Sequence, residues 1–299
     1  VKVGTVPGYS FKKLICDGRT ETGDTIVLED VSKDLEVSAH YEFYDYPLPG
    51  VFTVADDGEG NVRKVKFARG NLWCQNNVLH NEDEQYQFSS ADWENGGHIS
   101  HFMWSKSLAE SVKLKYEESG GDKDTFFTNT GHKRMDPNPD LIVNGQKGIW
   151  RVLSGGDNGE WNYLLNKRSS EYHRYAEVKV NDMAGLLIFP DEFSWPTGAG
   201  TEPAIFNALE PDDWNKVNYK GAAFEALQSA GCVFLPAAGN RNGRDGHTVI
   251  SPVYGYYWSA YTDNYIHAFG LSFYLKFFNS NDNRERSNAY AVRLVTDVK

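Results

Sequence analysis

Short apolar runs separated by Gly and Asp residues fill the first 46 residues of the chain. Runs rich in β-branched and aromatic residues predict strands, and the Gly and Asp positions between them predict turns. Residues 25–28 and 35–41 are two such runs, and Asp17-Gly18 is one such turn. This part is therefore expected to be a small all-β module.

A rigid connector follows, because Pro47 and Pro49 flank Leu48 and each Pro fixes its own φ and restricts the residue before it. The domain boundary is placed here, which gives a module at residues 1–47 and a larger domain at residues 48–299. The expected role of the first module is that of a stalk or spacer.

In the larger domain, residues 51–54 and 62–68 alternate as two strands joined by a turn at 56–61. Two helices are predicted, at 159–167 after an Asp157 or Asn158 cap and at 219–230 before Gly231. Short strands are predicted at 174–180, 186–189 and 233–235. Residues 76–140 are polar and are expected to form ordered loops with one short helix near 107–116.

The last part of the chain alternates aromatic and polar residues most densely, between Tyr254 and Tyr290. Strands are predicted at 256–259, 271–275 and 289–295, with a polar loop at 279–288. Aromatic residues make up 14% of the chain, an excess that suits a surface for gripping partners. The alternative is that these rings form the core of a β-meander.

The net charge of -11 argues against a nucleic-acid or anionic-membrane partner, since such surfaces are contacted by clustered Lys and Arg. Cys16, Cys74 and Cys232 are odd in number and far apart, so they indicate neither a disulfide framework nor a zinc site. No apolar run is long enough to span a membrane. The chain starts with Val1, and we expect a mature or truncated extracellular protein whose export signal is missing.

Two resemblances rest on ordered motifs. Pro7-Gly8-Tyr9-x-Phe11, Asp17-Gly18 and residues 34–41 resemble the Listeria–Bacteroides repeat, although Lys13-Leu14 replaces its usual Gly-Trp. Seven further motifs in order are similar to gut-bacterial surface proteins related to the Fibrobacter major paralogous domain. They are KFARGNL (66–72), WRVLS (150–154), WNYLLNKR (161–168), LIFPD (187–191), FLPAAGNRNG (234–243), YYWS (256–259) and VRLV (292–295).

This resemblance implies an α+β domain of the C-type-lectin-like variant shared with formylglycine-generating enzymes. Such a domain has two main helices and short antiparallel strands, and here a small β-grasp-like module would precede it. Several members of the group are variable proteins of diversity-generating retroelements, in which miscopied adenines change Asn codons near the C-terminus. The resemblance therefore implies an extracellular or cell-surface protein with a diversified binding segment.

The residue chemistry of 254–290 fits that description, because the expected scaffold residues alternate with residues that an AAC codon reaches by adenine changes. That codon cannot yield Lys or Glu, so Lys276 and Glu285 are left out. The expected scaffold residues are Trp258, Ala268, Leu271, Phe273, Phe277 and Val292. The expected ligand-binding residues are Tyr261, Thr262, Asp263, Asn264, Tyr265, His267, Phe269, Ser272, Tyr274, Phe278, Ser280, Asp282, Arg284, Ser287 and Asn288.

The expected partner is a protein or glycan on another cell, a phage or a host. An invariant carbohydrate-binding adhesin or fimbrial tip is the alternative, and an oxidase of the formylglycine-generating type is a weaker one. That oxidase needs two nearby late cysteines, but only Cys232 is late. We therefore expect a protein that is not an enzyme.

No cofactor or metal is expected either. His98 and His101 have a metal-like spacing without a third ligand, and the calcium-binding Pro loop of lectins is missing. The acidic pairs 191–192 and 212–213 are assigned to surface or helix-start charges, and Gly239 to Gly246 to a structural turn region. Arg241 and Arg293 are expected to bind buried carboxylates or loop carbonyls.

Overall fold

The computed structural model describes residues 2–3, 9–23, 25–28, 31–43, 46–76, 78–89, 97–104, 141–209, 217–242, 248–249, 254–262, 267–274 and 277–298. The helix expected near 107–116 lies outside them. The chain divides into two compact units, Val1–Tyr46 and Pro47–Lys299, so the division falls at the Pro47 connector.

The first unit contains a three-stranded antiparallel sheet in the order β2-β1-β3. Its strands are β1 (Tyr9–Cys16), β2 (Arg19–Glu21) and β3 (Val37–Phe43). Asp17 and Gly18 join β1 to β2 with φ of 48° and 80°, a left-handed conformation that Gly and Asp tolerate best. The predicted turn at Asp17-Gly18 is thus confirmed.

The second unit is built around an antiparallel sheet with the order β11-β22-β5-β4. The hairpin predicted from the alternating pattern is confirmed as β4 (Phe52–Asp56) and β5 (Val62–Phe67). The C-terminal strand β22 (Leu294–Asp297) lies between β5 and β11 (Arg151–Val152). The alternating side chains of the hairpin, including Phe52 and Phe67, are fully buried in the main core.

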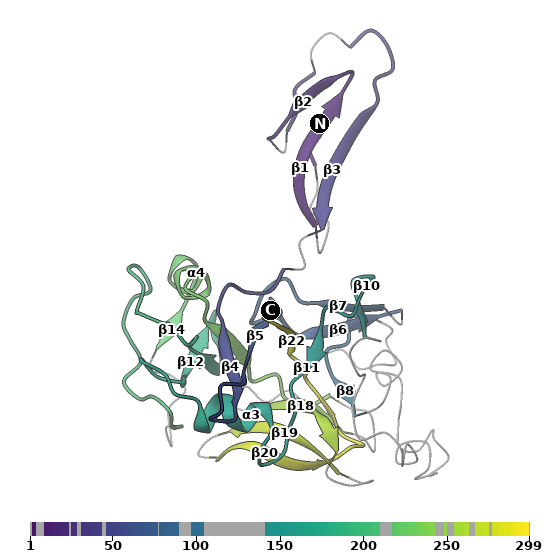
Figure 1. Cartoon of the computed structure of the whole chain (residues 1–299). Helices are drawn as coiled ribbons and strands as arrows, with labels where there is room; N and C mark the ends of the chain where they lie inside the picture. Colours follow the sequence, from purple (N-terminus) through teal and green to yellow (C-terminus); the bar gives the residue numbers. More distant parts are fainter. Residues whose placement is uncertain are drawn as a thin grey trace, which may run out of the picture. The chain divides into compact units, whose positions relative to one another are not determined.

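A second sheet of this unit has the order β14-β12-β13-β15. Its antiparallel strands are β12 (Tyr175–Val180), β13 (Met183–Ile188) and β15 (Val233–Pro236), while β14 (Asn218–Tyr219) runs parallel to β12. Helix α4 (Ala222–Ser229) buries Phe224 and Leu227 in the same cluster as Val178 and Phe234 of this sheet. Figure 1 shows α4 beside β14.

The predicted C-type-lectin-like α+β fold with two main helices is wrong. The described residues form mostly strands, arranged in small sheets of two to four strands. Their helices are α4 and α3 (Glu160–Asn162), which continues into a π-helical turn, Tyr163–Lys167. Figure 1 shows how short these helices are beside the sheets.

The physical reason for the missing helix length is local at each site. Tyr219 was expected in a helix, but its backbone pairs with β12, its side chain is buried, and Gly221 after it has φ of 48°. In the other segment, Arg168 N–H donates to Tyr163 O at 2.7 Å, a five-residue spacing that widens the helix and ends it. At Tyr219, strand pairing has therefore overridden helix propensity.

The C-terminal part forms an antiparallel sheet of β18 (Tyr254–Thr262), β19 (His267–Tyr274) and β20 (Phe277–Glu285). The polar loop predicted at 279–288 is wrong, because most of it is strand β20. Ser280 bonds to Asn162 of α3 and to Asn166 of the π-helical turn, and Asn281 donates to Asp157 before α3. These bonds compensate for the low strand propensity of Asn and Ser. In Figure 1 this sheet, in yellow, lies beside α3.

Arg293, near the C-terminus, forms hydrogen bonds with distant segments of this unit. Its guanidinium is fully buried and donates to Asn71 Oδ1 at 3.0 Å and to Phe234 O at 2.7 Å, and it also reaches the carbonyls of Ala68, Arg69 and Gln85. The expected role of Arg293 in binding loop carbonyls is confirmed.

The remaining strands are β6 (Leu72–Gln75), β7 (Val78–Asn81), β8 (Phe102–Met103), β9 (Ile142–Val143), β10 (Gln146–Lys147), β16 (Asn240–Arg241), β17 (Thr248–Val249) and β21 (Ala289–Tyr290).

Candidate functional site

One face of the β18–β19–β20 sheet packs on the main core, and the other is buried at Trp258 and Ala268 and half-exposed elsewhere. Tyr257 pairs with Leu271, and both are buried in the main core together with Phe273. Since side chains alternate along a strand, the neighbours of these residues point the other way. Tyr274, next to Phe273, is one of these neighbours. It pairs with Tyr254, and both rings are partly exposed.

The half-exposed side carries a connected set of aromatic rings. We call it the aromatic face and define it by Tyr254, Tyr256, Tyr274, Phe277 and Arg284. Tyr254 and Tyr274 meet edge to face with centroids 5.0 Å apart, and Tyr274 stacks on Phe277 at 4.7 Å. These contacts fix the rings while leaving area exposed, with Phe277 at 36%. Rigid, partly exposed rings offer contact area at a low cost in side-chain entropy.

Arg284 gives this face a positive charge that is held in position. Its guanidinium lies 5.6 Å from the ring centroid of Tyr256, in cation–π geometry. Its Nε donates to Asp282, which also accepts a hydrogen bond from the buried Ser272 hydroxyl. Burial alone would lower the pKa of Arg284, but Asp282 outweighs this and raises the pKa. The guanidinium is therefore charged and pre-oriented beside the aromatic rings.

Four predicted binding residues, Ser272, Tyr274, Asp282 and Arg284, come together on this side of the sheet. Of these, Ser272 is 1% exposed and Asp282 is 7% exposed, so they serve mainly to orient Arg284. Tyr274 and Arg284 are the two whose side chains remain available to a partner.

Other predicted residues lie elsewhere. Phe278 packs on the main core and stacks on Tyr175 at 4.8 Å, and the buried Ser280 hydroxyl bonds to Asn162 and Asn166. Phe269 lies against the turn at Gly155, and Ser287 is buried. Asn288 is partly buried in the turn after β20. His267 begins β19, where its backbone lies opposite that of Glu285 in β20, and Thr262 is the last residue of β18. Asp263, Asn264 and Tyr265 lie outside the described residues.

Sequence reasoning missed Tyr254, Tyr256 and Phe277. The structure exposes Phe277, which was expected to be scaffold, and turns Phe278 inward. A shift of one residue in a strand exchanges its two faces, and the sequence pattern at 279–288 predicts a loop rather than a strand. Alternation along β20 would also misplace Phe277. Counting back from Asp282 in steps of two puts Phe278 on the same face as Asp282, but the register shift between Gly270 and Ser272 puts Phe277 there instead.

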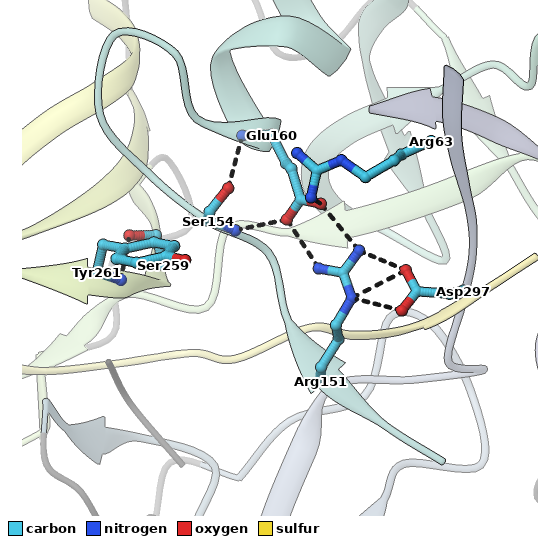
Figure 2. A network of polar contacts seen from close by, with 7 residues as sticks. All are labelled: Arg63, Arg151, Ser154, Glu160, Ser259, Tyr261 and Asp297. Carbon is cyan, nitrogen blue, oxygen red and sulfur yellow. Dashed lines mark hydrogen bonds and ion pairs between the residues drawn. The ribbon is translucent and has the colours of Figure 1, made fainter. Parts of the chain in front are cut away.

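Tyr261, another predicted residue, lies at a separate place. It is 38% exposed and borders a hollow of about 640 Å³ between β5, the turn before α3 and the end of β22. The hollow contains a buried ion pair between Arg151 and Glu160, with two bonds of 2.8 Å. Asp297 binds the same guanidinium, and Figure 2 shows these groups opposite Tyr261.

The paired histidines have separate roles. His98 Nε2 lies 2.5 Å from Glu82 Oε1, and the His98 ring stacks on Trp73. His101 is buried, with Nε2 3.0 Å from Ala238 O. Burial lowers the pKa of His101 to about 4, so the ring is neutral at pH 7. The described residues bring together no group of three His, Cys, Asp or Glu side chains that could hold a metal ion.

The remaining candidates are structural where they are described. Asp191 accepts from Arg168 Nη1 at 2.9 Å and from Thr53 Oγ1 at 2.7 Å, so it is a packed ion-pair partner rather than a free surface charge. Arg241 is buried and reaches His101 O. The carboxylates at 212–213 and the glycines at 243 and 246 lie outside the described residues.

No protein-family model, curated protein or solved structure matches this chain. Within the described part of the chain, the helices are all too short to cross a membrane.

Proposed function

We propose that this chain is an extracellular ligand-binding protein, and that the aromatic face is its contact surface. The observation that carries this proposal is the placement of the Arg284 guanidinium between Asp282 and the Tyr256 ring. A charged donor fixed beside half-exposed Tyr and Phe rings provides both directional hydrogen bonds and apolar contact area. Protein and glycan ligands both use this combination.

The energetic argument favours binding by a rigid surface. Tyr256 stacks on the buried Tyr290 at 4.9 Å, and Tyr290 packs on Trp258 at 4.3 Å. The exposed rings are thus anchored to the core by the buried ones. A pre-organised surface loses little conformational entropy when a partner binds, so more of the contact energy appears as affinity.

The resemblance to variable proteins of diversity-generating retroelements supports a further proposal, that some residues of this segment differ between copies of the gene. An invariant adhesin that binds one carbohydrate through the same rings is the alternative. A nearby reverse-transcriptase gene and a template repeat that differs at adenines are expected under the first proposal. If the genome contains neither, diversification is ruled out and the invariant adhesin remains as the proposed function.

The oxidase alternative receives no support from the cysteines. Cys232 is fully buried, and burial raises the pKa of its thiol, which disfavours the thiolate that binds metal and attacks substrates. Cys74 belongs to a different core cluster from Cys232, and Cys16 belongs to the first unit. We therefore do not propose an enzymatic activity.

A screen of glycan and protein arrays with the purified chain tests the contact surface. The Tyr256→Ala/Tyr274→Ala double variant is expected to lose binding at least tenfold, and Arg284→Gln to weaken it. Tyr46→Ala is the matched control, because Tyr46 is 64% exposed and lies far from this sheet in the sequence. If the double variant keeps its native circular dichroism and binds like wild type, the aromatic face is not the contact surface.

A further inference from the structure

The hollow beside Tyr261 has the size and the unused donors of a second binding site. At about 640 Å³ it falls within the range of pockets that hold small molecules. Its walls come from β5, β18, β22 and the turn before α3, all in the second unit. It is lined by different residues from the aromatic face, so the two surfaces can be tested separately.

The deepest acceptor in the hollow is already saturated. Glu160 is 1% exposed, and its Oε1 accepts from Arg151 Nη2 at 2.8 Å. Its Oε2 accepts from Arg151 Nη1 and from the backbone N–H of Ser154, each at 2.8 Å. Asp297 in turn binds Arg151 through Nε and Nη2 (Figure 2). These carboxylates hold Arg151 in place. Because their oxygens already accept hydrogen bonds, the hollow is poorly suited to a cationic ligand.

One donor at the rim is in surplus. The Arg63 side chain is 60% exposed, and its ion pair to Glu160 Oε1 is long, at 3.3 Å. Lys64, the next residue of β5, points to the other face of the strand and lies 3.9 Å from Asp191 Oδ2. A guanidinium has five N–H donors, so Arg63 retains donors for an incoming anion. A planar carboxylate matches the fork of Arg63.

Tyr261 adds an exposed ring at the opposite side of the hollow (Figure 2). Asn158 and the outer edge of Asp297 add polar atoms that suit hydroxyl groups. We propose that this hollow binds an acidic sugar of the uronate class. Its carboxylate binds the Arg63 guanidinium, one ring face packs on Tyr261, and its hydroxyls bond to Asn158 and Asp297.

Calorimetric titration of the full chain with D-glucuronate, D-glucose and succinate tests this site. D-glucuronate is expected to bind with a Kd on the order of 1 mM, as is usual for a small, solvated ligand. D-glucose and succinate are each expected to bind at least tenfold more weakly, because one lacks the carboxylate and the other the hydroxylated ring. Succinate binding as tight as that of glucuronate, or no saturable glucuronate binding, would overturn the proposal.

Two variants localise the binding. Arg63→Gln is expected to weaken glucuronate at least tenfold, and the exposure of Arg63 makes the fold insensitive to this change. Arg19→Gln is the matched control, because Arg19 is 62% exposed and paired with Glu21 in the first unit. The Tyr256→Ala/Tyr274→Ala variant is expected to bind glucuronate normally. Equal affinity in Arg63→Gln and wild type would place the ligand elsewhere.

Discussion

Arg151 and Glu160 face each other through two parallel hydrogen bonds of 2.8 Å, with side chains that are 8% and 1% exposed. Burial alone would lower the pKa of Arg151, but Asp297 and Glu160 together raise it, so the guanidinium stays charged. The pair fixes the turn before α3 to the central sheet, since Glu160 also accepts the Ser154 N–H. It thereby shapes one wall of the hollow.

Replacing Glu160 with Gln removes the more buried of the two carboxylates that compensate Arg151, the other being Asp297. We expect the free energy of unfolding to fall by about 2 kcal/mol, less than for a fully uncompensated buried charge, because Asp297 still binds the guanidinium. All eight tryptophans lie after Pro47, so their fluorescence during urea unfolding reports on the second unit alone.

Asp297→Asn is the control for this change, because the Asp297 side chain is 54% exposed. Its expected cost is below about 1 kcal/mol. Equal costs for the two variants would mean that burial of Glu160 does not set the strength of the pair.

Phe277 and Phe278 are expected to differ in their contribution to stability. Phe278→Ala removes a ring that packs on the main core and stacks on Tyr175, so we expect a loss of about 2 kcal/mol. Phe277→Ala removes an exposed ring and is expected to cost less than about 1 kcal/mol. Urea unfolding of both variants checks this, and the reverse order would show that the register of β20 is shifted by one residue.

The β4–β5 hairpin and strand β20, which carries Phe277 and Phe278, differ in how well the sequence predicts them. Alternation over residues 51–68 was clear enough to predict the β4–β5 hairpin, because the apolar residues Phe52, Val54, Val65 and Phe67 recur at every second position and are buried. In β20 the polar residues Asn279, Asn281 and Asn283 obscure the strand, and the contact that holds Asn281 comes from a distant segment. Asn281 Nδ2 donates to Asp157 Oδ1.

The hollow was not predictable for a related reason. Arg151 binds Asp297 across 146 positions of sequence, and no local pattern signals such a contact. Tyr261 was predicted as a binding residue from its composition alone, and its place beside this network emerges only from the fold. Both predicted helices are present, as α4 and as α3 with its π-helical turn, but α4 begins later than predicted because Tyr219 pairs with β12.

Stability is expected to depend on the protonation of His101 at mildly acidic pH. The pKa of this buried side chain is lowered from 6.5 to about 4, so the unfolded chain binds a proton at pH 5 and the folded chain does not. The contribution of neutral His101 is complete above pH 6.5 and is lost as the pH falls towards 4. Between pH 7 and pH 5 this loss amounts to about 2 kcal/mol.

His101→Gln separates this effect from the titration of carboxylates. Gln has no titratable group, but it can still donate to the Ala238 carbonyl that His101 Nε2 contacts. Urea unfolding at pH 7 and pH 5 is expected to show a smaller difference in this variant than in wild type. The same pH dependence in both proteins would rule out His101 as its source.

Gly155 allows the turn before α3 to lie close against the β18–β19 sheet. A Cβ at this position would lie 2.3 Å from Ser259 Oγ and 2.4 Å from Phe269 Cβ, both on short, constrained parts of their side chains. Gly155→Ala is therefore expected to push the turn outward and to reduce the free energy of unfolding by about 1–3 kcal/mol. Gly97→Ala is the control, because its Cβ would meet nothing within 4 Å, and it is expected to change stability by less than about 0.5 kcal/mol.

Since Gly155 also lines the hollow, the outward shift is expected to weaken glucuronate binding in the same variant. A stable Gly155→Ala protein with unchanged binding would show that the turn does not shape this site.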